Sequence, residues 1–131
     1  AAVDAAFATL RAALPSMIRM LRAGAPAATI VLVTYARLVP PTPCPALAYS
    51  QQGFALVGSI GTRLEQTFLD VVQQTGVRLA DPYVLGADHG PCAPAAARWV
   101  DGHSAPAAYP YHPTALGHEE MASLVQAALS K

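Results

Sequence analysis

The hydrophobic positions of this chain follow two alternating patterns. Over residues 3–21 they recur every three or four residues, which is the spacing of one helix face. Pro15 interrupts this helix, so we expect a kink or a break there, and Gly24 and Pro26 end it. Residues 29–35 then form an unbroken apolar, β-branched run. Such a run predicts a strand buried on both faces, as in a parallel sheet covered by helices.

The rest of the chain repeats this order and then departs from it. The pattern predicts a long helix over residues 49–74, a short strand over 77–80 and a last helix over 115–130. Residues 81–113 are rich in Gly and Pro, and so long a loop in a compact domain is usually functional. Helices alternating with buried strands predict an α/β fold with a parallel sheet, in which ligands bind at the C-terminal ends of the strands. Two strands alone make a poor sheet, so we expect residues 1–131 to be an incomplete part of one domain.

Composition narrows the function classes. Hydrophobic residues make up 53% of the 131 residues, and Lys and Arg balance Asp and Glu at 8 each. This balance lacks the basic surface of a nucleic-acid binder, so no nucleic-acid partner is expected. No apolar run approaches the roughly 20 residues of a membrane span, so no transmembrane segment is expected. The sequence opens directly in a helical pattern, so a signal peptide either preceded it or never existed.

The two cysteines, Cys44 and Cys92, stand in separate Pro-rich loops. A reactive or metal-binding pair more often lies close in sequence, so this spacing favours one disulfide. A disulfide indicates an oxidising location, either secreted or extracellular or in the cell envelope. Two unpaired thiols are the alternative. The Asp, His and Cys residues of the loops match no compact ligand spacing, so we predict no metal site and no cofactor.

The most informative stretch is residues 111–122, Tyr-His-Pro-Thr-Ala-Leu-Gly-His-Glu-Glu-Met-Ala. It resembles the last conserved block of the SGNH (GDSL-type) hydrolases, in which a catalytic His is followed by Pro, a small polar residue, Gly-His and a final helix. Residues 28–37 resemble the fourth strand of the secreted bacterial esterase and lipase branch. The segments 81–83, 88–92 and 98–100 resemble the loop that leads to the catalytic block.

This resemblance implies both a fold and an activity. The fold is the C-terminal portion of a three-layer α/β/α, flavodoxin-like domain with a parallel sheet. The activity is that of a serine ester hydrolase acting on acyl esters, linked to lipid or to carbohydrate, without a cofactor. A non-catalytic remnant that binds lipid or a partner protein is the alternative function.

His112 is the candidate catalytic base. A serine hydroxyl is a weak nucleophile until a neighbouring base accepts its proton, and histidine titrates in the range that this task requires. A turn stiffened by Pro113, just before a helix, can hold the ring while leaving it open to substrate. The alternative is a histidine that only packs at the start of a helix.

The partner of His112 departs from the family pattern. Many relatives have an Asp three residues before the catalytic His, and this position is Tyr109 here. Some secreted members use a main-chain carbonyl instead, so we predict that the carbonyl of Tyr109 orients His112. Asp101 or Asp88 folding back to the ring is the alternative.

The nucleophile is a second departure. The family carries its serine in a Gly-Asp-Ser segment after the first strand, with oxyanion-hole residues in later blocks, and none of these blocks occurs here. Ser59 comes closest to a nucleophile motif but falls inside a helical pattern. We therefore expect the nucleophile on a missing or separate N-terminal polypeptide, and this chain alone to be inactive. Trp99 and Tyr111 are candidate walls of an acyl pocket.

Overall fold

Helices and strands alternate along the chain in the order that the hydrophobic pattern predicts. The computed structural model describes residues 2–104 and 109–130. Its elements are α1 (Ala2–Gly24), β1 (Val31–Val33), α2 (Gln51–Thr75), β2 (Arg78–Ala80), α3 (Pro82–Leu85), the 3₁₀ turn η1 (Ala95–Ala97) and α4 (Ala115–Leu129).

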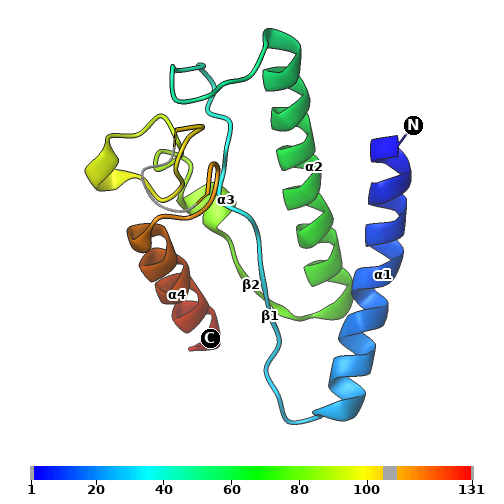
Figure 1. The fold of residues 1–131 in the computed structure, drawn as a ribbon. Coiled ribbons are helices and arrows are strands. Elements are labelled where there is room, and N and C mark those ends of the chain that lie inside the picture. Colours follow the sequence, from blue (N-terminus) through cyan, green and yellow to red (C-terminus); the bar gives the residue numbers. More distant parts are fainter. Residues whose placement is uncertain (1, 105–108, 131) are drawn as a thin grey trace.

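The strands form the central layer. β1 and β2 pair in parallel, with Leu32 opposite Leu79, and the ladder continues where Thr34 N–H donates to the Ala80 carbonyl at 3.1 Å. Helices α1 and α2 lie on one side of this sheet, α4 lies on the other, and the helices run opposite to the strands (Figure 1). The fold is thus a three-layer α/β/α arrangement with a short parallel sheet.

Local capping explains where α2 begins and ends. The Ser50 hydroxyl accepts the Gly53 N–H at 3.1 Å, which satisfies one of the free donors of the first turn. At the other end Gly76 takes φ 65°, and its N–H donates to the Val72 carbonyl at 2.8 Å. A Cβ at Gly76 would meet nothing within 4 Å, so the left-handed conformation is the reason for glycine here.

Two hydrophobic clusters hold the layers together. The first lies between α1, α2 and the sheet and is centred on Ile18, Val71 and Val77. The second is centred on Trp99 and Val100, with apolar side chains of α4 packed against it. Val100 is fully buried, so the loop that precedes α4 belongs to the core.

Strand β1 differs from the sequence expectation. It is three residues long, and Val33 and the next outward residue, Tyr35, are 39% and 40% exposed. Within the described residues this face of β1 is therefore only partly covered, in contrast to the predicted burial of both faces. The physical reason is that α4, on that side of the sheet, packs mainly over β2.

Helix α1 continues through Pro15, so of the two predicted outcomes, a kink or a break, the break into two helices does not occur. Pro15 lies on the buried face of α1 together with Phe7 and Ile18. Packing along this face offsets the backbone hydrogen bond that the proline cannot make. None of the helices in the described ranges has the length and hydrophobicity that crossing a membrane requires.

Candidate active site

His112 lies beyond the C-terminal ends of the strands, in the turn that leads into α4. Its side chain is exposed, and Nδ1 lies 2.8 Å from the Pro110 carbonyl oxygen. A carbonyl oxygen can only accept, so Nδ1 carries the proton in this contact. Nε2 then has a free lone pair, which is the state of a base ready to accept a proton.

The carbonyl on the ring of His112 belongs to Pro110, so the predicted use of the Tyr109 carbonyl needs correction. Tyr111 has φ 60°, and this left-handed residue turns the chain so that the carbonyl two residues before His112 meets the ring. The Tyr109 ring is 68% exposed, with its centroid 5.6 Å from that of His112.

The two carboxylates considered as alternatives have other roles. Asp101 is 7% exposed, and its Oδ1 lies 3.6 Å from Arg98 Nη1. Its backbone N–H donates to the His112 carbonyl at 3.0 Å, so Asp101 supports the backbone of His112. Asp88 is exposed, and no carboxylate of the described residues is hydrogen-bonded to the imidazole.

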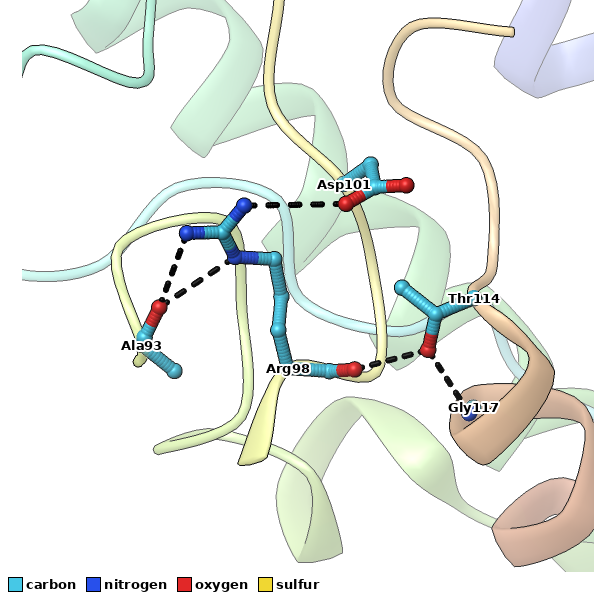
Figure 2. Close-up of polar contacts among 5 residues, drawn as sticks. All are labelled: Ala93, Arg98, Asp101, Thr114 and Gly117. Carbon is cyan, nitrogen blue, oxygen red and sulfur yellow. Dashed lines mark hydrogen bonds and ion pairs between the residues drawn. The ribbon is translucent and has the colours of Figure 1, made fainter. Parts of the chain in front are cut away.

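Arg98 connects the segments around this turn, as Figure 2 shows. Its Nε and Nη2 donate to the Ala93 carbonyl at 3.2 and 3.0 Å, and its own carbonyl accepts the Thr114 hydroxyl at 2.7 Å. The Thr114 Oγ1 also accepts the Gly117 N–H at 3.0 Å and so caps α4. One arginine therefore links the loop at Ala93 to the first turn of α4.

Gly117 allows α4 to approach this loop closely. A Cβ at Gly117 would collide with the Trp99 carbonyl, which is backbone and cannot move aside cheaply. That same carbonyl accepts the Thr114 N–H at 2.9 Å. The glycine of the His-Pro-Thr-Ala-Leu-Gly segment is thus required by contact between two backbones.

The predicted disulfide is present between Cys44 and Cys92, whose Cα atoms are 5.8 Å apart. It joins the loop before α2 to the residue next to Ala93, whose carbonyl binds Arg98. The disulfide is therefore connected to the His112 turn through Arg98, which contacts both Ala93 and Thr114.

Trp99, a predicted wall of an acyl pocket, packs inside the loop, and its predicted contact with an acyl group stays a prediction. Only 7% exposed, it stacks on His89 with a centroid distance of 4.8 Å and fills the space next to Gly86. His89 is fixed in turn, because its Nδ1 donates to the Ala97 carbonyl at 2.7 Å. Both rings are packing residues that hold the loop.

Tyr111 is half-buried beside His112, and its predicted contact with an acyl group stays a prediction. Its ring stacks on Tyr49 at 5.2 Å, and its hydroxyl accepts the Ala48 N–H at 3.2 Å. Burial, and then the neighbouring Tyr111, raise the pKa of Tyr49. Among the described residues Tyr111 is the one non-glycine with positive φ, a conformation that costs about 1–3 kcal/mol.

Tyr35 is a residue that sequence reasoning missed. Its hydroxyl donates to the Tyr111 carbonyl at 2.8 Å across 76 residues, and burial raises its pKa. The pattern marked Tyr35 as the last residue of a strand and gave no sign of this contact. The sequence did carry signals for Thr114 and Gly117. Thr before an apolar helical pattern is typical of an N-cap, and Gly117 lies in the segment that resembles the family block.

A mainly apolar cavity of about 130 Å³ lies between residues 35–39 and α2. The Glu65 carboxyl lines it, and burial, together with the negative charge of Asp81, raises the pKa of Glu65 against the opposing effect of Arg37. The Arg37 guanidinium lies 4.7 Å from the Tyr83 ring centroid. Nowhere in the described ranges do three His, Cys, Asp or Glu side chains gather in a way that could hold a metal ion.

Comparison of the sequence with known protein families shows the class to which this fold belongs. A family model, described as the GDSL-like lipase/acylhydrolase family, matches residues 2–120, and the chain belongs to this family. No curated protein is similar enough to count as a match.

Solved structures give the same fold. The extracellular lipase from Streptomyces rimosus superposes with a TM-score of 0.73, and phospholipase A1 from Streptomyces albidoflavus with a TM-score of 0.79. Each is 22% identical to this chain. Each match covers 96% of this chain but only 55% of the other protein, so the chain spans about half the length of these relatives.

Proposed function

We propose that this chain is the C-terminal part of a serine ester hydrolase and that His112 is its general base. The observation that carries the proposal is the bond from His112 Nδ1 to the Pro110 carbonyl on an exposed ring, which leaves Nε2 free. Membership of the GDSL-like lipase/acylhydrolase family supports the reaction class.

The proposed reaction is acyl transfer in two stages. His112 Nε2 takes the proton of a serine hydroxyl while the serine oxygen bonds to the ester carbonyl carbon. The imidazolium then gives this proton to the departing alcohol, and an acyl-serine remains. A water molecule, deprotonated by the same Nε2, releases the acid and restores the serine. The Pro110 carbonyl fixes the tautomer and stabilises the imidazolium less than a carboxylate would.

We propose that the nucleophile lies on an N-terminal segment outside these residues. Ser16, Ser59 and Ser123 lie within helices α1, α2 and α4, which are unsuited to a nucleophile turn after a strand. The 55% coverage of the two Streptomyces enzymes supports a further segment of the domain. That segment, whether attached or separate, is the proposed partner.

The proposed substrates are acyl esters, with lipid esters among them. The solved relatives are a lipase and a phospholipase A1, and both are ester hydrolases of lipids by name. We also propose secretion, because a disulfide suits an oxidising compartment and one relative is described as extracellular.

The test is His112→Ala in the whole native protein, with His118→Ala as the matched control. His118 is an exposed histidine six residues further along, on α4. We expect His112→Ala to lower kcat on a short acyl ester by at least about 10⁴-fold, because nucleophile activation is lost. His118→Ala should stay within about 2-fold, since the substitution removes an exposed side chain and keeps the backbone bond to Thr114.

A fluorophosphonate probe then locates the nucleophile. Labelling of a second polypeptide, or of a segment N-terminal to these residues, supports the proposal. Labelling within residues 1–131 contradicts the proposed place of the serine. Unchanged turnover in His112→Ala contradicts the catalytic role of His112 and favours a non-catalytic remnant that binds lipid or a partner.

A further inference from the structure

The hydroxyl of Tyr35 connects the end of strand β1 to the turn that carries His112. It donates to the Tyr111 carbonyl at 2.8 Å. We propose that Tyr35 is a positioning residue for His112, which acts by holding Tyr111 in its left-handed conformation. This inference rests on the proposed function only where activity is the readout, because the effect on the His112 ring can be measured directly.

Tyr111 needs restraint because its backbone conformation is unfavourable for a residue with a Cβ. At φ 60° it would relax to negative φ in a free chain. Several contacts oppose this relaxation: the Tyr35 hydroxyl donates to the Tyr111 carbonyl, and the Tyr111 N–H donates to the Gly102 carbonyl at 3.4 Å. The Tyr111 side chain is held as well, by the Ala48 N–H on its hydroxyl and by the Tyr49 ring stacked on its own. The contacts with Gly102 and Tyr35 act on the backbone, and the shorter one, from Tyr35, acts on the peptide unit that leads into His112.

The conformation of Tyr111 determines what the His112 ring meets. The Tyr111 carbonyl belongs to the same peptide unit as the His112 nitrogen. A contact that fixes this oxygen therefore also fixes the orientation of the peptide plane that precedes His112. On the other side the His112 carbonyl accepts the Asp101 N–H at 3.0 Å. With both flanking peptides held, Nδ1 reaches the Pro110 carbonyl at 2.8 Å. Relaxation at Tyr111 would remove this contact and free the tautomer.

Tyr35 is well suited to this task because its backbone directly follows the last residue bonded in the sheet ladder. The preceding residue, Thr34, donates its N–H to Ala80 at 3.1 Å and its hydroxyl to Asp81 Oδ1 at 2.6 Å. The Tyr35 side chain is 40% exposed, so its burial alone is a weak reason for a tyrosine. The hydrogen bond from the Tyr35 hydroxyl therefore fixes the position of the His112 turn relative to the sheet.

The test is Tyr35→Phe in the whole native protein, which removes the donor and keeps the ring. Tyr83→Phe is the matched control, because the Tyr83 hydroxyl pairs with Thr62 Oγ1 at 3.1 Å and has no contact with the turn. We expect Tyr35→Phe to lower kcat roughly 10-fold with KM within about 2-fold, since misorientation of the base affects the chemical step. Tyr83→Phe should leave both parameters within about 2-fold.

A spectroscopic readout separates this inference from the proposed function. Nitrogen-15 NMR of the His112 ring should report protonated Nδ1 in the native protein and in Tyr83→Phe, and a mixture of tautomers in Tyr35→Phe. If His112→Ala keeps full activity, the proposed function fails, yet this tautomer test still holds. If the tautomer and kcat in Tyr35→Phe equal those of Tyr83→Phe, the inference is overturned.

A double-mutant cycle tests the route through Tyr111. Asparagine tolerates the left-handed region better than tyrosine, so Tyr111→Asn lowers the need for restraint. We expect Tyr35→Phe to change the tautomer ratio, and kcat, by less than about 2-fold in that background. Equal effects of Tyr35→Phe in both backgrounds would mean that Tyr35 does not act through Tyr111.

Discussion

Two regions of this molecule are held in opposite ways. Helices α1 and α2 are long and regular, but the ion pair between them, Arg63–Asp4 at 2.9 Å, has side chains 36% and 68% exposed. Along α1, three large apolar side chains are more than half exposed: Met17, Met20 and Leu21. Residues 86–104 and 109–114 have little regular structure, yet they include the fully buried Val100.

The difference shows that regular structure and tertiary attachment are separate properties. A helix satisfies its backbone groups internally, whereas an irregular segment must find partners elsewhere. In residues 86–104 and 109–114 these partners are specific atoms, such as the Arg98 guanidinium on Ala93 and the Thr114 hydroxyl on Arg98. Substitutions should therefore be more damaging in this loop than in the helical pair.

The largest effect should come from removing the disulfide. Cys44 and Cys92 are 48 residues apart, and on the loop-entropy argument their bond contributes about 4 kcal/mol to the free energy of unfolding. We expect Cys44→Ser with Cys92→Ser to lower that free energy by this amount in urea titrations, and the reduced native protein should match the double variant. A loss below about 1 kcal/mol would show that other contacts hold the loop.

Gly117→Ala should have the next largest effect. The added methyl collides with the Trp99 carbonyl, and forcing an atom into a packed site typically costs about 1–3 kcal/mol. We expect a value near the upper end from thermal unfolding. Gly24→Ala, where a Cβ meets nothing within 4 Å, is the control and should be neutral or slightly stabilising. Equal effects of the two variants would remove the distinction between loop and helix.

Arg98→Lys compares the two ion pairs directly. Lysine keeps the charge but loses the two-pronged contact with the Ala93 carbonyl, so we expect a loss of about 1.5–2 kcal/mol. Arg63→Lys, at the shorter but exposed pair with Asp4, should cost less. The free energies of unfolding in urea give both values. The reverse order would mean that burial does not decide between the pairs.

The smallest effect that we expect is a pH dependence of the free energy of unfolding that comes from Glu65 on α2. Burial raises the pKa of Glu65 above 4.5, with a further contribution from Asp81. In the unfolded chain the Glu65 carboxyl has its usual pKa, whereas in the folded protein its pKa is raised. The contribution of Glu65 to the free energy of unfolding is therefore complete below the usual pKa, and it is lost as the pH rises through the raised pKa. Relative to Glu65→Gln, the native protein should lose a little stability as the pH rises above 4.5. Parallel pH profiles of unfolding free energy would contradict this.

The sequence was sufficient for the order of the long helices and the two strands and for the family, because these depend on local signals. Ser50 and Gly76 cap α2 where the pattern ends, and the block around His112 identified the turn before α4. The carbonyl on His112 was assigned one residue too early, because it depends on the left-handed Tyr111, and tyrosine gives no local sign of that conformation. The Tyr35 contact spans 76 residues and depends on the tertiary fold, so no periodicity could reveal it.

The disulfide has a consequence for how this chain reaches its oxidised state. Cys44 and Cys92 are the two cysteines of these 131 residues, so a single intramolecular pairing exists and scrambled isomers cannot form within them. The remaining error is a bond between two molecules, whose rate rises with concentration while the rate of internal ring closure does not. Dilution during oxidative refolding should therefore favour the native bond without a disulfide isomerase, and covalent dimers should accumulate when the reduced chain is concentrated.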